Sequence, residues 1–196
     1  MTTLEVTAVR SVSGEQAVRL RRVLSAAREL AGEGGYPAVA IQEVANRSGV
    51  ARATIYRYFS SKDHLLAAVF AEWAVEMTDT FRRDPPQGPT PADRVGALFD
   101  RVVDAALAEP GLTSAVVHAG VSGDPGAWRS EPTLARLMDD YLDAAIGDEV
   151  IAVDRRDIAT VLGHVLFSAL VAMTSHGMST DDVRSLLRTA AGVVLR

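Results

Sequence analysis

The stretch Ile41–Lys62, IQEVANRSGVARATIYRYFSSK, decides the fold, because its pattern predicts two short helices joined by a tight turn. Ala45 is a small residue where the two helices must cross closely. Gly49 follows four residues later, where the turn needs a residue that tolerates positive φ. The residues expected to face inward and hold the helices together are Val44, Val50, Ile55 and Tyr58. The pattern predicts a helix-turn-helix, a structure with which proteins read DNA.

The outer face of the second predicted helix carries side chains suited to phosphates and base edges. These side chains are Arg52, Ala53, Thr54, Tyr56 and Arg57. The alternative is an ordinary pair of packed helices, or a fold that has kept this shape and lost DNA binding. Basic and polar residues on one exposed face, beside a basic first helix, favour DNA binding. For Tyr58, core packing and phosphate contact are equally open.

Charge is divided unevenly along the 196 residues. Residues 1–62 carry nine Lys/Arg against five Glu, a net charge of +4, which leaves −9 for residues 63–196 within the total of −5. A basic end on an otherwise acidic chain is expected when only that end approaches DNA.

Composition argues against several classes of site. The chain has no cysteine, which excludes disulfides and thiolate metal sites. The four histidines lie on different predicted elements, so we predict no metal site and no cofactor. Neither a phosphate-binding glycine loop after a strand nor a Gly-x-Ser-x-Gly elbow occurs, and we predict that the protein is not an enzyme. The N-terminal sequence MTTLEVTAVRSVSGEQ lacks the pattern of a secretory signal, so we expect a cytoplasmic protein.

The long apolar stretches repeat at helical spacing, so we predict an all-α protein of about nine helices. The first helix is expected at Gly14–Ala31, ending in a cluster of glycines. The proline-rich segment DPPQGPTP, residues 84–91, cannot be helical and marks a boundary. We predict a three-helix DNA-binding domain at 14–77, with its helix-turn-helix at about 41–60, and a helical ligand-binding and dimerisation domain at 78–196.

Three later helices are expected to begin at capping boxes. In this motif a Ser or Thr and an acidic residue three positions later cap each other's backbone N–H groups. The predicted pairs are Ser60 with Asp63, Thr90 with Asp93, and Ser179 with Asp182.

The helix predicted at about 154–176 has no Asp, Glu, Lys or Arg between Asp157 and Asp181. Its length allows a membrane span. Its Thr, Ser and His residues favour a helix that meets its own domain on one side and a second subunit on the other. Together with the helix at about 179–195 it offers small residues for close approach: Gly163, Ala169, Ala172, Ala190, Ala191 and Gly192. We predict a homodimer through these two helices and no membrane partner.

Aromatic, histidine and methionine side chains in the second half are candidates for lining a pocket for a small molecule. They are Phe99, Trp128, Met138, Tyr141, His164, Phe167 and Met173. Each one by itself is more often plain core, because such residues fill cores at helical spacing, so the prediction is for the group. His118 and His164 are candidate polar anchors in an apolar cavity, although a buried histidine bonded to a carbonyl is commoner.

On these residues the chain resembles the TetR family of bacterial transcriptional repressors. The specific match covers about Leu20–Trp73, with GGY, IQEVANRSGV and ARATIYRYFSSKDHLL. The resemblance implies a dimer that binds a palindromic operator in double-stranded DNA and releases it when a small molecule enters the C-terminal domain. It implies DNA contacts at Arg52, Ala53, Thr54, Tyr56, Arg57 and Tyr58, and a phosphate contact at Lys62. The predicted set is completed by Gln42 and Arg47.

One position departs from the family pattern. Many members have Ser or Thr at the position of Ala40 or Ile41, where the hydroxyl binds a phosphate, and backbone N–H groups at the helix start are the candidates to replace that contact. The C-terminal half, especially AALAEPGLTSAVVHA, weakly resembles repressors of sterol and lipid breakdown in actinobacteria. We therefore expect a small hydrophobic effector. The alternative from another class is a helical small-molecule-binding protein whose N-terminal domain no longer reads DNA, and an enzyme comes third.

Overall fold

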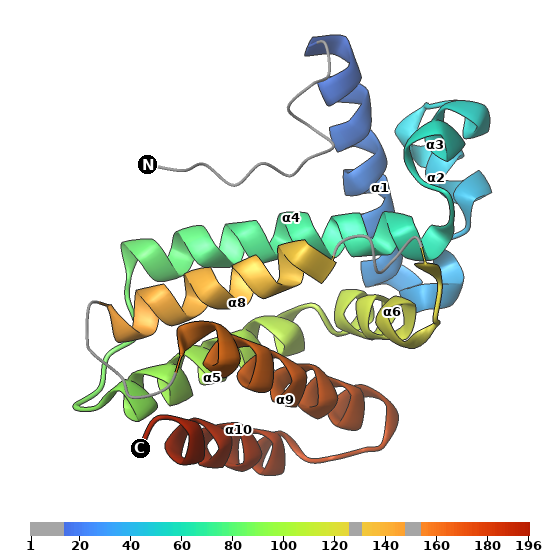
Figure 1. The fold of residues 1–196 in the computed structure, drawn as a ribbon. Helices are drawn as coiled ribbons and strands as arrows, with labels where there is room; N and C mark the ends of the chain where they lie inside the picture. Colours follow the sequence, from blue (N-terminus) through green and yellow to red (C-terminus); the bar gives the residue numbers. More distant parts are fainter. Residues whose placement is uncertain (1–13, 126–130, 148–153) are drawn as a thin grey trace. The chain divides into compact units, whose positions relative to one another are not determined.

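The computed structural model describes residues 14–125, 131–147 and 154–196. Within these residues every regular element is an α-helix, which confirms the predicted all-α class (Figure 1). The helices of this described part are α1 (Gly14–Ala38), α2 (Ile41–Ser48), α3 (Arg52–Tyr58), α4 (Lys62–Arg83), α5 (Pro91–Ala108), α6 (Pro110–Val121), α8 (Glu131–Ile146), α9 (Arg155–Ser175) and α10 (Thr180–Val194).

The helices form two compact units that do not follow chain order. The first unit contains α1, α2, α3, α4 up to Glu72, and α6. The second contains α4 from Trp73, α5, α8 from Leu134, α9 and α10. This differs from the predicted sequential boundary after residue 77, because α6 belongs to the first unit. The division by function, with DNA binding in 14–77 and ligand binding and dimerisation in 78–196, stays a prediction.

Close packing against α1 explains why α6 belongs to the first unit (Figure 1). A Cβ added at Gly111 would lie 2.5 Å from the carbonyl oxygen of Ala31 and 2.8 Å from that of Gly32. Only glycine fits at so close an approach of two backbones. Leu30 of α1 and Leu112 of α6 are both buried. The first unit therefore needs a helix that the sequence places between two helices of the second.

Helix α1 extends beyond its predicted end at Ala31. The backbone becomes non-helical only at Gly34 and Gly35, and Gly35 has a φ of 64°. A single glycine inside a helix, such as Gly32, costs about 1 kcal/mol relative to alanine and is tolerated, whereas a residue at positive φ ends the regular helix. The regular helix therefore ends within the predicted glycine cluster, at Gly34 and Gly35, a few residues later than the predicted bound at about Ala31.

The predicted capping boxes have different outcomes. Thr90 and Asp93 cap each other's backbone as predicted, with Pro91 in the first turn of α5. At α10 one half of the predicted box is formed: the Ser179 hydroxyl accepts from the backbone N–H of Asp182 at 3.1 Å, whereas the Asp182 carboxylate accepts from the Ser179 hydroxyl at 2.7 Å. At α4 the cap is Ser61 rather than Ser60, because the Ser61 hydroxyl accepts from the backbone N–H of His64 at 3.0 Å. The Asp63 carboxylate instead accepts a hydrogen bond from the Tyr36 hydroxyl, so the predicted box of Ser60 and Asp63 is not formed.

One apolar core fills the second unit. It is formed by buried side chains of the end of α4 and of α5, α8, α9 and α10, including Phe81, Leu98, Phe99, Leu142, Leu162 and Leu187. At the edge of this core, Arg184 of α10 bonds Asp104 of α5 at 2.5 Å, and Arg188 bonds Asp100 at 2.6 Å. Such partly exposed pairs add at most about 1 kcal/mol each, so apolar burial holds α5 and α10 together and the ion pairs fix their register.

Helix α9 is long and apolar enough to cross a membrane by length and composition, with a mean hydropathy of 1.8 in its best window, of which 28% is buried. Two of its small residues were predicted to face a second subunit. Ala169 is fully buried in the core of its own unit. A Cβ added at Gly163 would lie 3.8 Å from Met138 of α8. Ala169 therefore serves packing within the chain, and its predicted place at the interface was wrong. Gly163 is half-buried beside α8, and its contact with a second subunit stays a prediction.

Candidate nucleic-acid interface

The first unit contains the predicted helix-turn-helix. Gly49 ends α2 with φ 65° and ψ 25°, and its backbone N–H donates to the carbonyl of Ala45 at 3.0 Å. Val44 and Ile55 are fully buried between the two helices and Val50 is nearly so. Ala45 is also buried, as close crossing requires. The turn, the crossing and three of the four inward-facing residues are confirmed.

The fourth inward-facing residue behaves differently. Tyr58 is half-buried, and the fully buried aromatic residue at this end of α3 is Phe59. The hydroxyl-bearing ring of Tyr58 packs 6.5 Å from the ring of Phe59, centroid to centroid. Tyr58 therefore covers the core from outside, and a phosphate contact by its hydroxyl stays a prediction.

The outer face of α3 is exposed as predicted. Arg52, Ala53, Tyr56 and Arg57 are exposed, with 49% of Tyr56 accessible, while Thr54 is half-buried. An aromatic residue this exposed on a seven-residue helix contributes little to folding. This face is a surface of hydrogen-bond donors, one apolar Cβ and one aromatic ring, the groups that contact base edges and phosphates in a major groove.

Two side chains of α2 belong to the same surface as Arg52. The Gln42 amide nitrogen donates to Asn46 Oδ1 at 2.9 Å. Arg52 Nη1 donates to Gln42 Oε1 at 3.2 Å, which links α3 to α2. All three residues are exposed. Gln42 was predicted from its place on α2, whereas Asn46 was missed, although its position one helical turn after Gln42 is a usable signal.

Arg47 is held within the first unit. Its guanidinium forms a two-pronged ion pair with the carboxylate of Glu33, with N–O distances of 2.5 and 2.9 Å, and Glu29 lies 3.9 Å away. The hydrogen bond from Arg47 lowers the pKa of Glu33, and the same bond raises the pKa of Arg47. A DNA contact by Arg47 stays a prediction, and it requires this pair to open.

Lys62 also points into its own unit. Its ammonium donates to the backbone carbonyl of Tyr36 at 2.9 Å and lies 3.4 Å from the centroid of the Tyr36 ring. Burial lowers the pKa of Lys62. These contacts join the end of α1 to the start of α4 through a hydrogen bond and a cation–π interaction. The phosphate contact implied for Lys62 stays a prediction, and in this structure the ammonium serves the fold.

Tyr36 is the centre of these contacts and was not among the predicted site residues. Its hydroxyl donates to Asp63 Oδ1 at 2.7 Å, and its ring stacks on His118 of α6 with centroids 3.9 Å apart. Burial raises the pKa of Tyr36 to about 12, and the bond to Asp63 adds to the effect. His118 is exposed and lies in the first unit, so its prediction as a polar anchor of an effector cavity was wrong.

Arg22 of α1 is a further basic residue at this surface that the sequence does not single out. Its guanidinium lies against the turn, since a Cβ added at Gly49 would be 2.6 Å from Arg22 Nη2. Glycine at position 49 therefore provides both the positive φ and the room for this side chain. Arg22 is exposed, and the basic run in α1 is the only sequence signal for it.

The predicted effector-binding residues lie in the second unit, and most of those described are packed in its core. Phe99, Met138 and Tyr141 are buried members of the core. The Tyr141 hydroxyl donates to the carbonyl of Ala74 at 3.1 Å, and burial raises its pKa. Phe167 is half-buried. Trp128 lies outside the described residues.

His164 was predicted to line the same pocket, and the structure places it elsewhere. It is exposed on α9, and its Nδ1 lies 2.7 Å from the carbonyl oxygen of Thr160, one turn earlier in the same helix. The apolar neighbours of His164 at helical spacing suggested an inward-facing position. The prediction was wrong because α9 is apolar on its exposed side as well.

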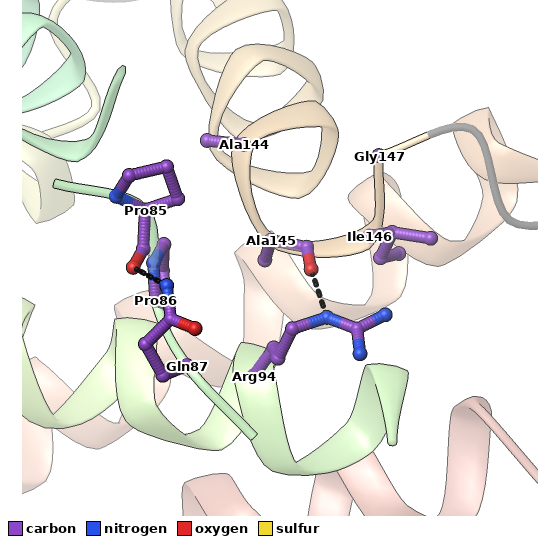
Figure 2. A pocket seen from close by; sticks show the side chains of 8 residues that line it. All are labelled: Pro85, Pro86, Gln87, Arg94, Ala144, Ala145, Ile146 and Gly147. Carbon is purple, nitrogen blue, oxygen red and sulfur yellow. Dashed lines mark hydrogen bonds between the residues drawn. The ribbon is translucent and has the colours of Figure 1, made fainter. Parts of the chain in front are cut away.

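The hollows described for the second unit have other linings. One of about 460 Å³ lies where α8 ends, between Pro85–Gln87, Arg94 and Ala144–Gly147 (Figure 2). Arg94 Nε donates there to the carbonyl of Ala145 at 2.6 Å, so the arginine caps the end of α8 (Figure 2). The hollow is open and partly polar, unlike the apolar chamber expected for a hydrophobic effector. Among the residues that the structure describes, no group of three or more potential metal ligands is found.

Comparison with known proteins covers both units. Residues 23–69 match the model of the bacterial regulatory proteins of the tetR family, and residues 88–194 match that of the tetracyclin repressor-like C-terminal domain. The HTH-type transcriptional repressor KstR of Rhodococcus jostii is 34% identical over 93% of this chain and 85% of its own length. KstR of Mycolicibacterium smegmatis is 32% identical over 93% and 90%. The crystal structure of a TetR transcriptional regulator from Rhodococcus sp. RHA1 superposes with a TM-score of 0.83 at 29% identity, covering 92% of this chain and 97% of that one.

Proposed function

Because the chain belongs to the TetR family of bacterial regulatory proteins, we propose that it is a ligand-responsive transcriptional repressor that binds a palindromic operator as a dimer. The observation that carries the proposal is the exposed face of α3, where Arg52, Tyr56 and Arg57 stand clear of a buried helix-turn-helix core. Relatives that match nearly the whole chain are named as transcriptional repressors, which supports the direction of regulation.

On this proposal α3 enters the major groove. Its exposed arginines and tyrosine contact base edges and phosphates, and the basic residues of α1 add attraction for the DNA backbone. A dimer places two copies of α3 in successive major grooves, roughly 34 Å apart, because that is one turn of DNA. The two half-sites of the operator are then inverted copies of each other.

The second unit supports a dimer through α9 and α10. These helices expose Val161 (47%), Leu186 (40%) and Val193 (60%), a concentration of large apolar side chains on two neighbouring elements. Only 28% of the apolar window of α9 is buried within the chain. Covering these residues with a second copy removes them from water, at about 25 cal/mol for each Å² of apolar surface.

The effector of the proposed repressor is a small hydrophobic molecule that binds within the second unit. The weak resemblance of the C-terminal half to repressors of sterol and lipid breakdown supports this class. An effector releases DNA only if it binds the DNA-free state more tightly, and tenfold release takes about 1.4 kcal/mol of that preference. Phe99, Met138, Tyr141 and Phe167 are the described candidates to line its site, which then opens by rearrangement of the core. We place the protein in the cytoplasm, where such a repressor meets its operator.

The proposal is tested by fluorescence anisotropy with the full chain and labelled DNA from upstream of its own gene. We expect saturable binding at physiological salt that survives excess unrelated DNA, and release by hydrophobic candidates such as fatty acyl or steroid derivatives. The matched pair is Arg57→Ala, which removes a proposed contact, and Arg83→Ala, which removes an exposed arginine of the second unit. If the wild type binds its upstream DNA no better than unrelated DNA, or if both variants bind equally well, the proposal is wrong.

A further inference from the structure

Three exposed side chains on the outer face of the helix-turn-helix form one hydrogen-bonded row. Asn46 and Gln42 are four residues apart on α2 and therefore share a face of that helix. Gln42 bonds to Asn46 at 2.9 Å and to Arg52 of α3 at 3.2 Å. The row thus runs from the end of α2 to the first residue of α3, where a recognition helix contacts base edges.

The chemistry of Arg52 fixes the orientation of the whole row. A guanidinium only donates hydrogen bonds, so the group of Gln42 that faces Arg52 must be its carbonyl oxygen. The amide nitrogen of Gln42 then points to Asn46, which must present its own carbonyl oxygen as the acceptor. Asn46 therefore anchors Gln42, and Gln42 anchors Arg52.

This orientation favours Arg52 as the side chain that reads a base. Glutamine recognises adenine through both ends of its amide at once, and each end of the Gln42 amide already makes one hydrogen bond within the row, so reading adenine as well would use its last N–H and its last lone pair. Arg52 gives one donor to Gln42 and keeps its remaining guanidinium donors. Arginine with two free donors recognises guanine through O6 and N7.

We propose that Asn46 and Gln42 are positioning residues: they fix the Arg52 guanidinium where it can hydrogen-bond to a guanine of the operator half-site. The proposal rests on the proposed function, since it concerns the bases that the same surface reads. In the free protein the three residues are exposed and their hydrogen bonds compete with water. When DNA covers them that competition ends, and a guanidinium already in place has less freedom to lose on binding.

The experiment measures base preference separately from overall affinity. The full chain is equilibrated with a DNA library whose half-sites are randomised, and bound sequences are counted at each position while anisotropy gives the affinity for the best site. We expect the wild type to prefer guanine at one position of each half-site. Arg52→Lys keeps the positive charge but removes the planar pair of guanidinium N–H donors. We expect it to reduce the guanine preference about tenfold, because a lysine offers no such pair.

Two substitutions of Asn46 provide the decisive contrast. Asn46→Leu has a similar size but no acceptor for Gln42, and we expect it to lose several-fold of the guanine preference at the Arg52 position alone. Asn46→Asp keeps an acceptor oxygen and adds a negative charge. We expect it to retain the preference while binding all sequences more weakly, because the carboxylate repels phosphates. Helix content and melting temperature are measured for each variant, and an exposed position makes both substitutions compatible with folding.

The outcomes separate this inference from the proposed function. If the wild type binds DNA and Asn46→Leu keeps the full guanine preference, the positioning role is wrong and the function stands. A preference for adenine that Gln42→Leu abolishes would also overturn the inference, because Gln42 would then read a base directly. If the wild type selects no sequence from the library, the proposed function itself fails.

Discussion

The surface of α2 and α3 and the core of the second unit differ in what fixes the positions of their side chains. On the surface, polar and basic residues stand exposed on short helices, so Gln42 and Arg52 have positions set by a few hydrogen bonds. In the core, Phe99 and Tyr141 have positions set by every neighbour they touch. A recognition surface can thus be deduced from helical register, whereas a ligand chamber depends on where packing is incomplete. The variants below break or sharpen this difference.

The largest effect is expected in the core of the second unit. Replacing Phe99 with alanine removes a fully buried ring, and we expect the free energy of unfolding to fall by about 3–5 kcal/mol in urea titrations. Leu107→Ala on the same helix is the control, since that leucine is exposed and should cost less than about 1 kcal/mol. A loss below about 1 kcal/mol for Phe99→Ala, joined to tighter binding of a hydrophobic dye, would show that Phe99 lines an existing chamber.

The exposed apolar face of α9 and α10 comes next. Val193→Asp places a charge where the proposed second subunit packs, and burying an unpaired carboxylate costs several kcal/mol. We expect the variant to sediment as a monomer at concentrations where the wild type is a dimer. Val18→Asp is a matched control, because Val18 is comparably exposed on α1 of the first unit and should leave the dimer intact. Identical sedimentation of all three proteins would contradict the proposed interface.

A smaller effect is expected where α1 meets α4. Tyr36→Phe removes the hydroxyl that donates to Asp63, and we expect a loss of about 1–2 kcal/mol near neutral pH. The pKa of Tyr36 is raised in the fold to about 12 from an ordinary 10, so its contribution is fully present below pH 10 and is lost as the pH rises through 12. Urea titrations from pH 8 to pH 12 should therefore show wild type and variant converging. An equal gap across this range would mean that the hydroxyl is not the cause.

The smallest effect concerns the salt dependence of DNA binding. Each lost phosphate contact reduces the slope of log affinity against log salt concentration by about 0.9. We expect this decrease for Arg57→Ala, because Arg57 is exposed on α3. Lys62→Met should leave the slope unchanged and lower the melting temperature, because the ammonium is bonded to Tyr36. A reduced slope for Lys62→Met would instead support the phosphate contact that the family resemblance implies for Lys62.

Much of the first unit follows from the sequence, because local rules decide it. Gly49 takes the positive φ that the turn needs, and Val44 and Ile55 fill the interior that their spacing indicates. The relations between distant segments do not follow in the same way. The pairing of Arg47 with Glu33 and the stacking of Tyr36 on His118 join residues that no helical period connects.

The second unit is predictable in outline only. The bounds of α9 and α10 agree with the predicted helices to within one residue. The faces of α9 do not, because a helix apolar on nearly all sides gives the sequence no contrast between inside and outside. His164 was predicted to face the interior for this reason, and the structure places it on the exposed side. Packing against α8 and α10, which no local pattern encodes, decides the orientation.

The membership of α6 in the first unit has a consequence for how regulators of this kind can exchange parts. The chain leaves that unit after Glu72 and returns to it at Pro110, so recombination near residue 78 would separate α1 from the helix that packs on it. The glycine contact between Gly111 and Ala31 leaves no room for a side chain, and an α6 from another protein would have to bring a glycine at the same place. A chimaera that folds therefore needs α1 and α6 from the same parent protein. The two helices are encoded by separate segments of the gene, so the exchangeable unit is discontinuous in sequence.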